Sequence, residues 1–487
     1  MTTPEISWIA ILPDLVLALG AAAVLLVDVQ WKPKAQALGT VVAGTLTVAL
    51  ALTVVQWVRA QDALESLGPA IGELVAFSGM ILMDGFAVFG RLAILVTTAI
   101  GLAAGWRLIE GLGRRRAEAI ALVLLASAGF SLMVAANNLV MVFLGLEVGS
   151  IALYVLAGMT RSSNDSDEAA LKYFLLGSFA SAIFVYGVAL MYSGTGQFEI
   201  LAIRQFFGAF VVTNPAVILI GISLMIVGLG FKVSAAPFHA WAPDVYQGAP
   251  AGFVGYMAAV AKIAGFAAIA RILITGLGDL DVNWLPVVAA ISAVSMLGGS
   301  LLALVEADIR RMLAYSGVAT AGFVMTGIVG GATSGILFYV AVYSLQLLGS
   351  FAVVSAVSGA ANSASKLDEY QGLAARSPGL AAGFTILLLG MAGLPLTSGF
   401  IAKFGVFSDA WSAGYEWLVI VAVLASVLAF AVYLRVVVNM YMSESDAGAL
   451  EVPDTARWVL LVSAAATIVW GILPGSLLDL ASSAFPL

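Results

Sequence analysis

The sequence predicts an all-α polytopic membrane protein with about 14 transmembrane helices. Of the 487 residues, 62% are apolar and only 10% are charged, whereas soluble domains carry about 25% charged residues. A helix needs roughly 20 apolar residues to cross a bilayer, so the apolar content suffices for on the order of 14 spans. The 51 glycines and 14 prolines are typical of membrane helices, where small residues permit close packing. These proportions exclude a soluble globular fold.

Apolar runs between charged or turn-rich breaks place the spans along the chain. The first run has no basic segment before it and no small-residue cleavage site after it, so we expect a retained helix rather than a signal peptide. The predicted spans are 8–28, 36–58, 80–106, 117–135, 138–158, 169–192, 213–237, 250–271, 284–305, 310–330, 335–358, 378–411, 417–441 and 457–480. Residues 1–487 therefore form a single membrane domain.

The loops predict the orientation, because Lys and Arg are retained on the cytoplasmic side. If the N-terminus lies outside, three basic residues fall in outer loops: Arg59, Arg204 and Arg271. Thirteen then fall in inner loops: Lys32, Lys34, Arg107, Arg114, Arg115, Arg116, Arg161, Arg310, Arg311, Lys366, Arg376, Arg435 and Arg457. We expect both termini on the outer, periplasmic side.

Two blocks of similar length suggest an internal repeat. The blocks are 117–271 and 284–441, and 1–106 and 457–487 supply flanking helices. Each block contains a span interrupted by proline beside a lysine, with Lys232 before Pro237 in the seventh span and Pro395 before Lys403 in the twelfth. Five helices per block reverse the direction of the second block, which predicts an inverted repeat with broken helices seven and twelve.

Four ionisable residues fall deep inside predicted spans. They are Glu147 in the fifth span, Lys232 in the broken seventh, Lys262 in the eighth and Lys403 in the broken twelfth. Each costs about 2.5–3.5 kcal/mol to insert, so it needs a partner or a function. One acid cannot pair with three lysines, and burial penalises the ammonium form, which favours a proton relay. The alternative is a set of structural interhelical clamps.

Other polar residues lie nearer the ends of spans. Lys172 is close to the inner end of the sixth span, where it can snorkel or join the relay. His239 follows Pro237 and is either an interfacial polar residue or a group that passes protons to the lysines. Arg91, near the start of the third span, is expected to snorkel or to contact a neighbouring subunit. The turn that contains Glu306, Asp308, Arg310 and Arg311 is expected to be a solvated interface.

Bound redox centres and nucleotides are not expected in this chain. It contains no cysteine and a single histidine, so iron–sulfur ligands are missing and a haem pocket is improbable. No phosphate-binding GxxxxGK[ST], no GxGxxG after a strand and no HExxH metal motif occurs. No basic stripe suggests nucleic acid. The chain therefore captures no energy from ATP hydrolysis or NADH oxidation by itself, and no cofactor or metal is predicted in it.

Five stretches carry a resemblance to a known family. They are GLEVGSIALYVLAG, EAALKYFLLGSFASAIFVYG, GFKVSAAPFHAWAPDVYQGAP, DIRRMLAYSGVATAGF and LPLTSGFIAKF. They resemble the antiporter-like membrane subunits of bacterial NADH–quinone oxidoreductase (respiratory complex I), a group that also includes the multisubunit Mrp-type sodium/proton antiporters. The acid in the first stretch and the lysine in the last favour the subunit N branch.

The resemblance implies a fold of 14 helices with two inverted five-helix repeats, and a function in proton translocation. Electron transfer from NADH to quinone would take place in partner subunits that carry FMN and iron–sulfur clusters, and this chain would contact other membrane-arm subunits in the bacterial inner membrane. An Mrp-type cation/proton antiporter and a purely structural membrane subunit remain alternatives.

The resemblance also implies roles for individual residues. Glu147 would be the coupling acid, Lys172 and Lys232 the lysines that it influences, Lys262 the central connecting residue and Lys403 the exchange site toward the outside. We expect Glu147 and Lys232 to form a switchable pair. The chain departs from a strict repeat because the tenth span, which corresponds to that of Glu147, contains no acid.

Overall fold

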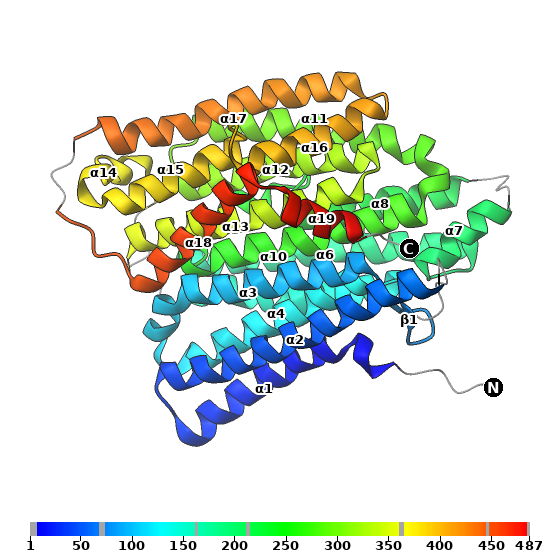
Figure 1. The fold of residues 1–487 in the computed structure, drawn as a ribbon, viewed down its shortest axis with the longest axis horizontal. Coiled ribbons are helices and arrows are strands. Elements are labelled where there is room, and N and C mark those ends of the chain that lie inside the picture. The colour runs from blue at the N-terminus through cyan, green and yellow to red at the C-terminus, as the bar shows by residue number, and fades with distance from the viewer. Residues whose placement is uncertain are drawn as a thin grey trace.

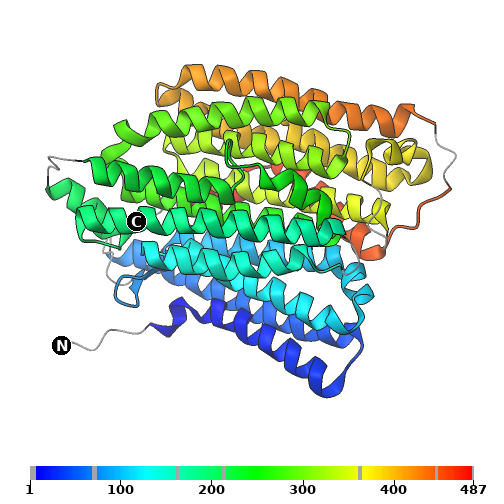
Figure 2. The same ribbon diagram turned by 180° about the vertical axis from the view of Figure 1, so that it is seen from behind.

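The computed structural model describes residues 7–67, 74–160, 164–210, 215–359, 365–444 and 448–484. Most of these residues form long helices that run side by side in one bundle, seen from the front in Figure 1 and from behind in Figure 2. The start of the first described helix and the end of the last lie toward the same end of the bundle (Figure 1).

The first half of the chain contains ten helices and one short hairpin within its described residues. Their bounds are α1 Leu12–Trp31, α2 Ala35–Leu67, β1 Val75–Ala76, β2 Ile81–Leu82, α3 Gly85–Gly111, α4 Arg116–Ala135, α5 Leu139–Ala157, α6 Asn164–Thr195, α7 Ile200–Ala209, α8 Ala216–Lys232, α9 Trp241–Gly248 and α10 Ala251–Ala270. A six-residue π-helix, Arg271–Gly276, continues α10.

The second half contains nine helices within its described residues. They are α11 Asp281–Val305, α12 Ile309–Gly330, α13 Thr333–Ser358, α14 Leu373–Arg376, α15 Pro378–Ala392, α16 Ser398–Ser412, α17 Glu416–Met442, α18 Asp454–Ile472 and α19 Gly475–Ser483. In the described part of the chain, twelve helices are long and apolar enough to cross a membrane. These helices confirm an all-α polytopic membrane fold.

The seventh predicted span is interrupted, as its proline predicts. Helix α8 ends at Lys232, and α9 begins at Trp241. Pro237 lies in the intervening segment and has no N–H to continue the helix. The backbone N–H of Ala236 instead donates to Oγ of Ser295 at 2.8 Å. The break therefore keeps its polar backbone groups within protein, which a membrane interior requires.

The twelfth predicted span is also divided. Helix α15 ends at Ala392, and its C-cap is Gly393 with a φ of +84°, a conformation that glycine adopts without steric cost. Helix α16 begins at Ser398, after the turn that contains Pro395. Both predicted breaks are thus confirmed.

Glycines permit the close packing of α4 against α5. A Cβ atom on Gly129 would lie 2.4 Å from the backbone N of Gly149, and one on Gly145 would lie 2.7 Å from the backbone O of Gly129. No side chain is tolerated at such distances, so the two backbones approach directly. This contact holds the helix that carries Glu147 firmly against its neighbour.

Arg91 is not at the lipid surface, contrary to the prediction. Its side chain is fully buried and donates to Oδ2 of Asp14 on α1 at 2.7 Å and to Oε1 of Gln56 on α2 at 3.0 Å. The physical reason is that a buried guanidinium is stabilised by a carboxylate and a carbonyl within the bundle. Arg91 therefore ties α1 and α2 to α3.

Arg271 is not in an outer loop, although the loop count placed it there. It lies in the π-helix, is 2% exposed, and donates to both carboxylate oxygens of Asp84 at 2.5 and 2.7 Å. Its guanidinium also lies 4.7 Å from the centre of the Phe86 ring. This bidentate pair joins the end of α10 to the start of α3.

Candidate functional site

Lys232 is buried at the C-terminal end of α8. Its side chain is surrounded by the rings of Phe130, Tyr154 and Tyr173, and its Nζ lies 4.9 Å from the centre of the Phe130 ring. Nζ donates to Oγ of Ser150 on α5 at 2.7 Å. The lysine is 3% exposed and has a hydroxyl rather than a carboxylate as its nearest partner, which confirms that it is buried without a direct counter-ion among the described residues.

Glu147 lies near Lys232 but does not contact it in this structure. Its carboxylate accepts a hydrogen bond from Ser181 on α6, and its side chain is half-buried. Ser150 follows Glu147 by three residues, so both point to the same side of α5. The structure therefore presents the two members of the predicted switchable pair in a separated arrangement, each bonded to a serine.

Lys262 connects the two blocks of the chain. It projects from α10, is 2% exposed, and its Nζ donates to the backbone O of Val233 at 2.8 Å and of Gly317 at 2.9 Å. Val233 is the C-cap of α8, and Gly317 lies in α12. The ammonium is therefore held by the negative end of a helix dipole on one side and by a second-block carbonyl on the other.

A small cavity lies between Lys232 and Lys262. Its walls also include Tyr173, Ser234 and Trp241, and its volume, measured as the space open to the centre of a water molecule, is about 10 Å³. That is about the least space that a single water molecule needs. The hydroxyls and ammonium groups around it supply polar partners for such a water.

The side chain of Lys403 reaches into the second break. It lies in α16 and is 5% exposed. Its Nζ donates to the backbone O of Ala392, the last residue of α15, at 2.8 Å and to Oγ of Ser426 at 3.4 Å. The ring of Phe323 lies 4.3 Å from Nζ. This site again combines a helix-end carbonyl, a hydroxyl and an aromatic face.

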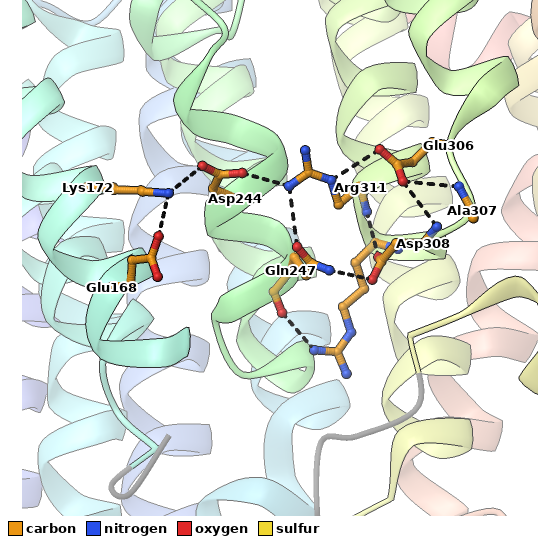
Figure 3. Close-up of polar contacts among 9 residues, drawn as sticks. Glu168, Lys172, Asp244, Gln247, Glu306, Ala307, Asp308 and Arg311 are labelled. Atoms are coloured by element: carbon orange, nitrogen blue, oxygen red, sulfur yellow. Dashed lines mark hydrogen bonds and ion pairs between the residues drawn. The ribbon is translucent and has the colours of Figure 1, made fainter. Parts of the chain in front are cut away.

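Lys172 belongs to a separate, more exposed network (Figure 3). Its Nζ lies 2.6 Å from Oε1 of Glu168 and 2.7 Å from Oδ2 of Asp244 on α9, and its side chain is 41% exposed. The other oxygen of Asp244 binds Arg311 of α12 at 2.6 Å, and Arg311 reaches Glu306 at 3.1 Å. The alternating charges join α6, α9 and the start of α12.

The turn between α11 and α12 is more buried than predicted. Arg310 is 1% exposed and Asp308 is 7% exposed. Asp308 caps α12 by accepting from the backbone N–H groups of Arg310 and Arg311, and it also accepts from Gln247 at 2.8 Å. Arg310 donates to Ser358 at 2.9 Å. Sequence reasoning missed this network because its partners are far apart in the chain.

His239 lies in the break between α8 and α9 and is half-buried. Its ring centre is 6.3 Å from that of Tyr315, and its Nδ1 has no hydrogen-bond partner among the described residues. Among the described residues, no hydrogen bond or ion pair joins His239 to a buried lysine. The structure thus does not bring His239 together with the three buried lysines, Lys232, Lys262 and Lys403.

Metal ligands do not gather anywhere in the described ranges. No group of three or more His, Cys, Asp or Glu side chains there could hold a metal ion. The groups that line the site are ammonium, carboxylate and hydroxyl groups, all of which hold or pass protons.

Comparison with known proteins decides the family. Residues 136–429 match the family model described as NADH:quinone oxidoreductase/Mrp antiporter, TM. A relative from Solibacter usitatus named NADH-quinone oxidoreductase subunit N 1 is 40% identical over 414 residues, which cover 84% of this chain and 85% of the relative. The chain belongs to the subunit N family. A member from Mycobacterium tuberculosis is 42% identical over 78% of this chain and 73% of its own length.

Solved structures agree with this family. A chain in the structure of respiratory complex I from Thermus thermophilus has a TM-score of 0.78 and 29% identity, with 96% of this chain and 99% of that chain covered. A chain of the Mrp complex from Dietzia sp. has a TM-score of 0.84 at 20% identity, covering 98% and 97%, and so shares the fold. The six candidate residues all lie within the segment that matches the family model: Glu147, Lys172, Lys232, His239, Lys262 and Lys403.

Proposed function

We propose that this member of the subunit N family is a proton-translocating membrane subunit of an NADH–quinone oxidoreductase. Electron transfer from NADH to quinone in partner subunits supplies the energy, and this chain moves protons across the membrane. Family membership supports the assembly. The observation that carries the proposal is that Lys232, Lys262 and Lys403 are all buried and bonded to hydroxyls and main-chain carbonyls instead of carboxylates.

The proton path begins at Lys232. A proton leaves its Nζ, crosses the small cavity through a water molecule and binds Nζ of a neutral Lys262. Lys262 donates to Gly317 of α12, so it stands at the boundary of the second block. From there the proton reaches Lys403, which exchanges it with the outside. Each transfer moves one proton between nitrogen atoms and leaves the donor lysine neutral.

Glu147 controls the first step of this path. When its carboxylate faces Lys232, the negative charge favours the ammonium form of the lysine; when it turns to Ser181, that support is lost and the proton moves on. Ser150 bonds Lys232 in the separated arrangement. We propose that charge rearrangement in neighbouring subunits drives the change between the two arrangements.

Lys172 lies on the entry side. Its ammonium, held by Glu168 and Asp244 in the exposed network, stays charged and stands at the inner entrance of the path. His239 is half-buried in the helix break, but no contact among the described residues joins it to the buried lysines, so we leave it outside the path.

The arrangement in the membrane follows from the loop charges. We place both termini on the outer side of the bacterial inner membrane, because basic loop residues are concentrated at the opposite end. Burial of Arg271 in a pair with Asp84 removes one of the three outer basic residues and strengthens this asymmetry. FMN and iron–sulfur clusters belong to partner subunits, since this chain has no cysteine.

The test uses the complete complex reconstituted in vesicles with a pH-sensitive dye. Lys232→Ala should abolish most NADH-driven proton transport, whereas Lys34→Ala, at an exposed loop lysine, should not change it. Normal assembly of both variants is checked by subunit composition. Equal proton transport by Lys232→Ala and the parent complex would refute the relay.

The alternative is an Mrp-type cation/proton antiporter, which the family description and the shared fold also accommodate. It would depend on an existing ion gradient. Purification of the chain with its natural partners separates the two functions: flavin and iron–sulfur absorption in the complex supports the oxidoreductase, and their absence together with sodium-driven proton movement supports the antiporter.

A further inference from the structure

Three hollows meet at one corner of the bundle, where α18 begins beside the end of α3 (Figure 1). Thr455 lines all three. One hollow is an apolar groove of about 570 Å³ between α2 and α3, the second is a cationic pocket of about 300 Å³, and the third is a surface hollow of about 450 Å³ edged by acids. An apolar, a cationic and an anionic surface therefore meet at one residue, as the binding of a single amphipathic molecule requires.

The apolar groove is about as long as one leaflet of a bilayer. It is lined on α2 from Gly39 to Leu50, which corresponds to roughly 16 Å of helix, half of a hydrocarbon core of about 30 Å. Trp106 lines both the groove and the acid-edged hollow. Tryptophan is enriched at the boundary between hydrocarbon and head groups, so the groove suits an acyl chain that ends at that depth.

The cationic pocket suits a phosphate group. Arg107 and Arg115 line it, together with the hydroxyl-bearing residues Thr160 and Ser355. Neither arginine forms an ion pair with the described residues, in contrast to Arg116, which lies 3.6 Å from Asp28. The hydroxyl oxygen of Thr160 is buried and has no hydrogen-bond partner among the described residues. Arg115 is held in place by the backbone O of Met159, to which it donates at 3.0 Å. Two guanidinium groups without a carboxylate partner and an unsatisfied hydroxyl suit an anion.

The third hollow suits a cation. Glu110, Glu451 and Asp454 line it, and it shares Arg107 with the phosphate pocket. Glu110 accepts a hydrogen bond from Trp106 at 3.1 Å, and Asp454 has only an exposed partner, Arg457, at 3.5 Å. Three exposed carboxylates beside the phosphate pocket disfavour a purely anionic head group and favour one that also carries an ammonium group.

We propose that this corner binds a glycerophospholipid whose head group combines a phosphate with a primary ammonium, as in phosphatidylethanolamine. The acyl chain lies between α2 and α3, Arg107 and Arg115 bind the phosphate, and the three carboxylates bind the ammonium. The lipid joins the flanking helices to the start of α18. The binding site lies at the end of the bundle that carries the arginine-rich loops.

The experiment measures lipid bound to the full-length chain, purified from membranes with its natural partners. The complex is stripped with detergent and titrated with micelles of phosphatidylethanolamine or phosphatidylglycerol of identical acyl chains, and bound lipid is quantified by mass spectrometry. Phosphatidylethanolamine should bind more tightly. Substituting Arg107→Gln or Arg115→Gln should weaken its binding by about fivefold each, whereas Arg114→Gln, at a neighbouring exposed arginine outside the pocket, should leave it unchanged.

A second pair of variants tests the groove without changing any charge. Ala99→Phe fills the groove and should reduce lipid binding, while Ala51→Phe, at an exposed alanine of α2 outside it, should not. Three results would each overturn the proposal. The Arg107 and Arg114 variants could bind the lipid equally well, phosphatidylglycerol could bind as tightly as phosphatidylethanolamine, or millimolar inorganic phosphate could displace the lipid. Because the readout is bound lipid, the result does not depend on proton transport.

Discussion

In the first block, the backbone O of Val233, at the end of α8, accepts a hydrogen bond from Lys262 of α10. In the second block, the backbone O of Ala392, at the end of α15, accepts one from Lys403 of α16, the other half of the same broken helix. Both ammonium groups thus sit at the negative end of a half-helix. Only Lys262 also reaches the other block, through Gly317. The first break is therefore linked by Lys262 to residues 284–441, whereas the hydrogen bonds of Lys403 at the second break stay within 284–441.

The blocks also differ in charge. Lys232 has a carboxylate nearby, Glu147 on α5, whereas α12, which occupies the corresponding place in the predicted repeat, contains no acid in its sequence. Lys403 is instead beside Phe323 and Ser426. We infer that the first block receives the electrostatic input and that the second block passes the proton outward without an acid of its own.

The largest expected effect comes from breaking the connection between the blocks. Lys262→Gln keeps a hydrogen-bond donor for the carbonyls of Val233 and Gly317 but cannot carry a proton, so NADH-driven proton transport should fall by at least about tenfold. Proton uptake by vesicles, normalised to the amount of assembled complex, measures this. Full activity of the glutamine variant would mean that Lys262 is only an interhelical clamp.

Neutralising the acid of the first block should have the next largest effect. Glu147→Gln preserves the contact with Ser181 but removes the charge that acts on Lys232, and we expect about a fivefold loss of proton transport, equivalent to roughly 1 kcal/mol. Glu118→Gln, at an exposed acid of α4, is the matched control. If the two variants behave alike, the asymmetry between the blocks has no functional meaning.

The serines that accept hydrogen bonds from Lys232 and Lys403 should differ in their effect on proton transport. Ser150 lies 2.7 Å from Nζ of Lys232, whereas Ser426 lies 3.4 Å from Nζ of Lys403. Ser150→Ala should slow proton transport by about fivefold, as expected for the loss of one typical hydrogen bond, and Ser426→Ala by less than about twofold. A larger effect of Ser426→Ala would reverse the assignment of input and exit.

The smallest effect is expected at the network that joins α6, α9 and α12. Asp244→Asn removes the charge shared by Lys172 and Arg311, but the Asp244 side chain is 35% exposed, so the loss of stability should be only about 1 kcal/mol. Thermal unfolding of the purified complex at low and high salt measures it, and the difference should shrink as salt screens the pairs. Asp479→Asn, at an exposed acid of α19, is the control.

Sequence alone predicted the features that depend on local pattern. Long apolar runs located the membrane helices. Pro237 and Pro395 located the two breaks, because a proline in the interior of a span has no N–H and clashes with the preceding turn. The burial of Lys232, Lys262 and Lys403 followed from their central place in apolar runs. The ten-residue helix α7 was missed because it is too short to produce a membrane-length hydropathy signal.

Features that depend on pairing between distant residues were not predicted. Asp14 and Arg91 are 77 residues apart, and Asp84 and Arg271 are 187 residues apart. Hydropathy treats each charge separately, so Arg91 was assigned to the surface and Arg271 to a loop, although each charge is neutralised by an acid on another helix. Acids near the ends of apolar runs, such as Asp14 and Asp84, were the available signal for these pairs.

The most direct test of the central claim is the number of protons translocated per electron pair in vesicles that contain the complex with Lys403→Ala. In the proposed path Lys403 is the exit to the outer side, so we predict that this ratio falls. In a separate measurement with an uncoupler present to dissipate the gradient, electron transfer from NADH to quinone should continue. An unchanged ratio in a fully assembled Lys403→Ala complex would contradict the proposed route through the buried lysines.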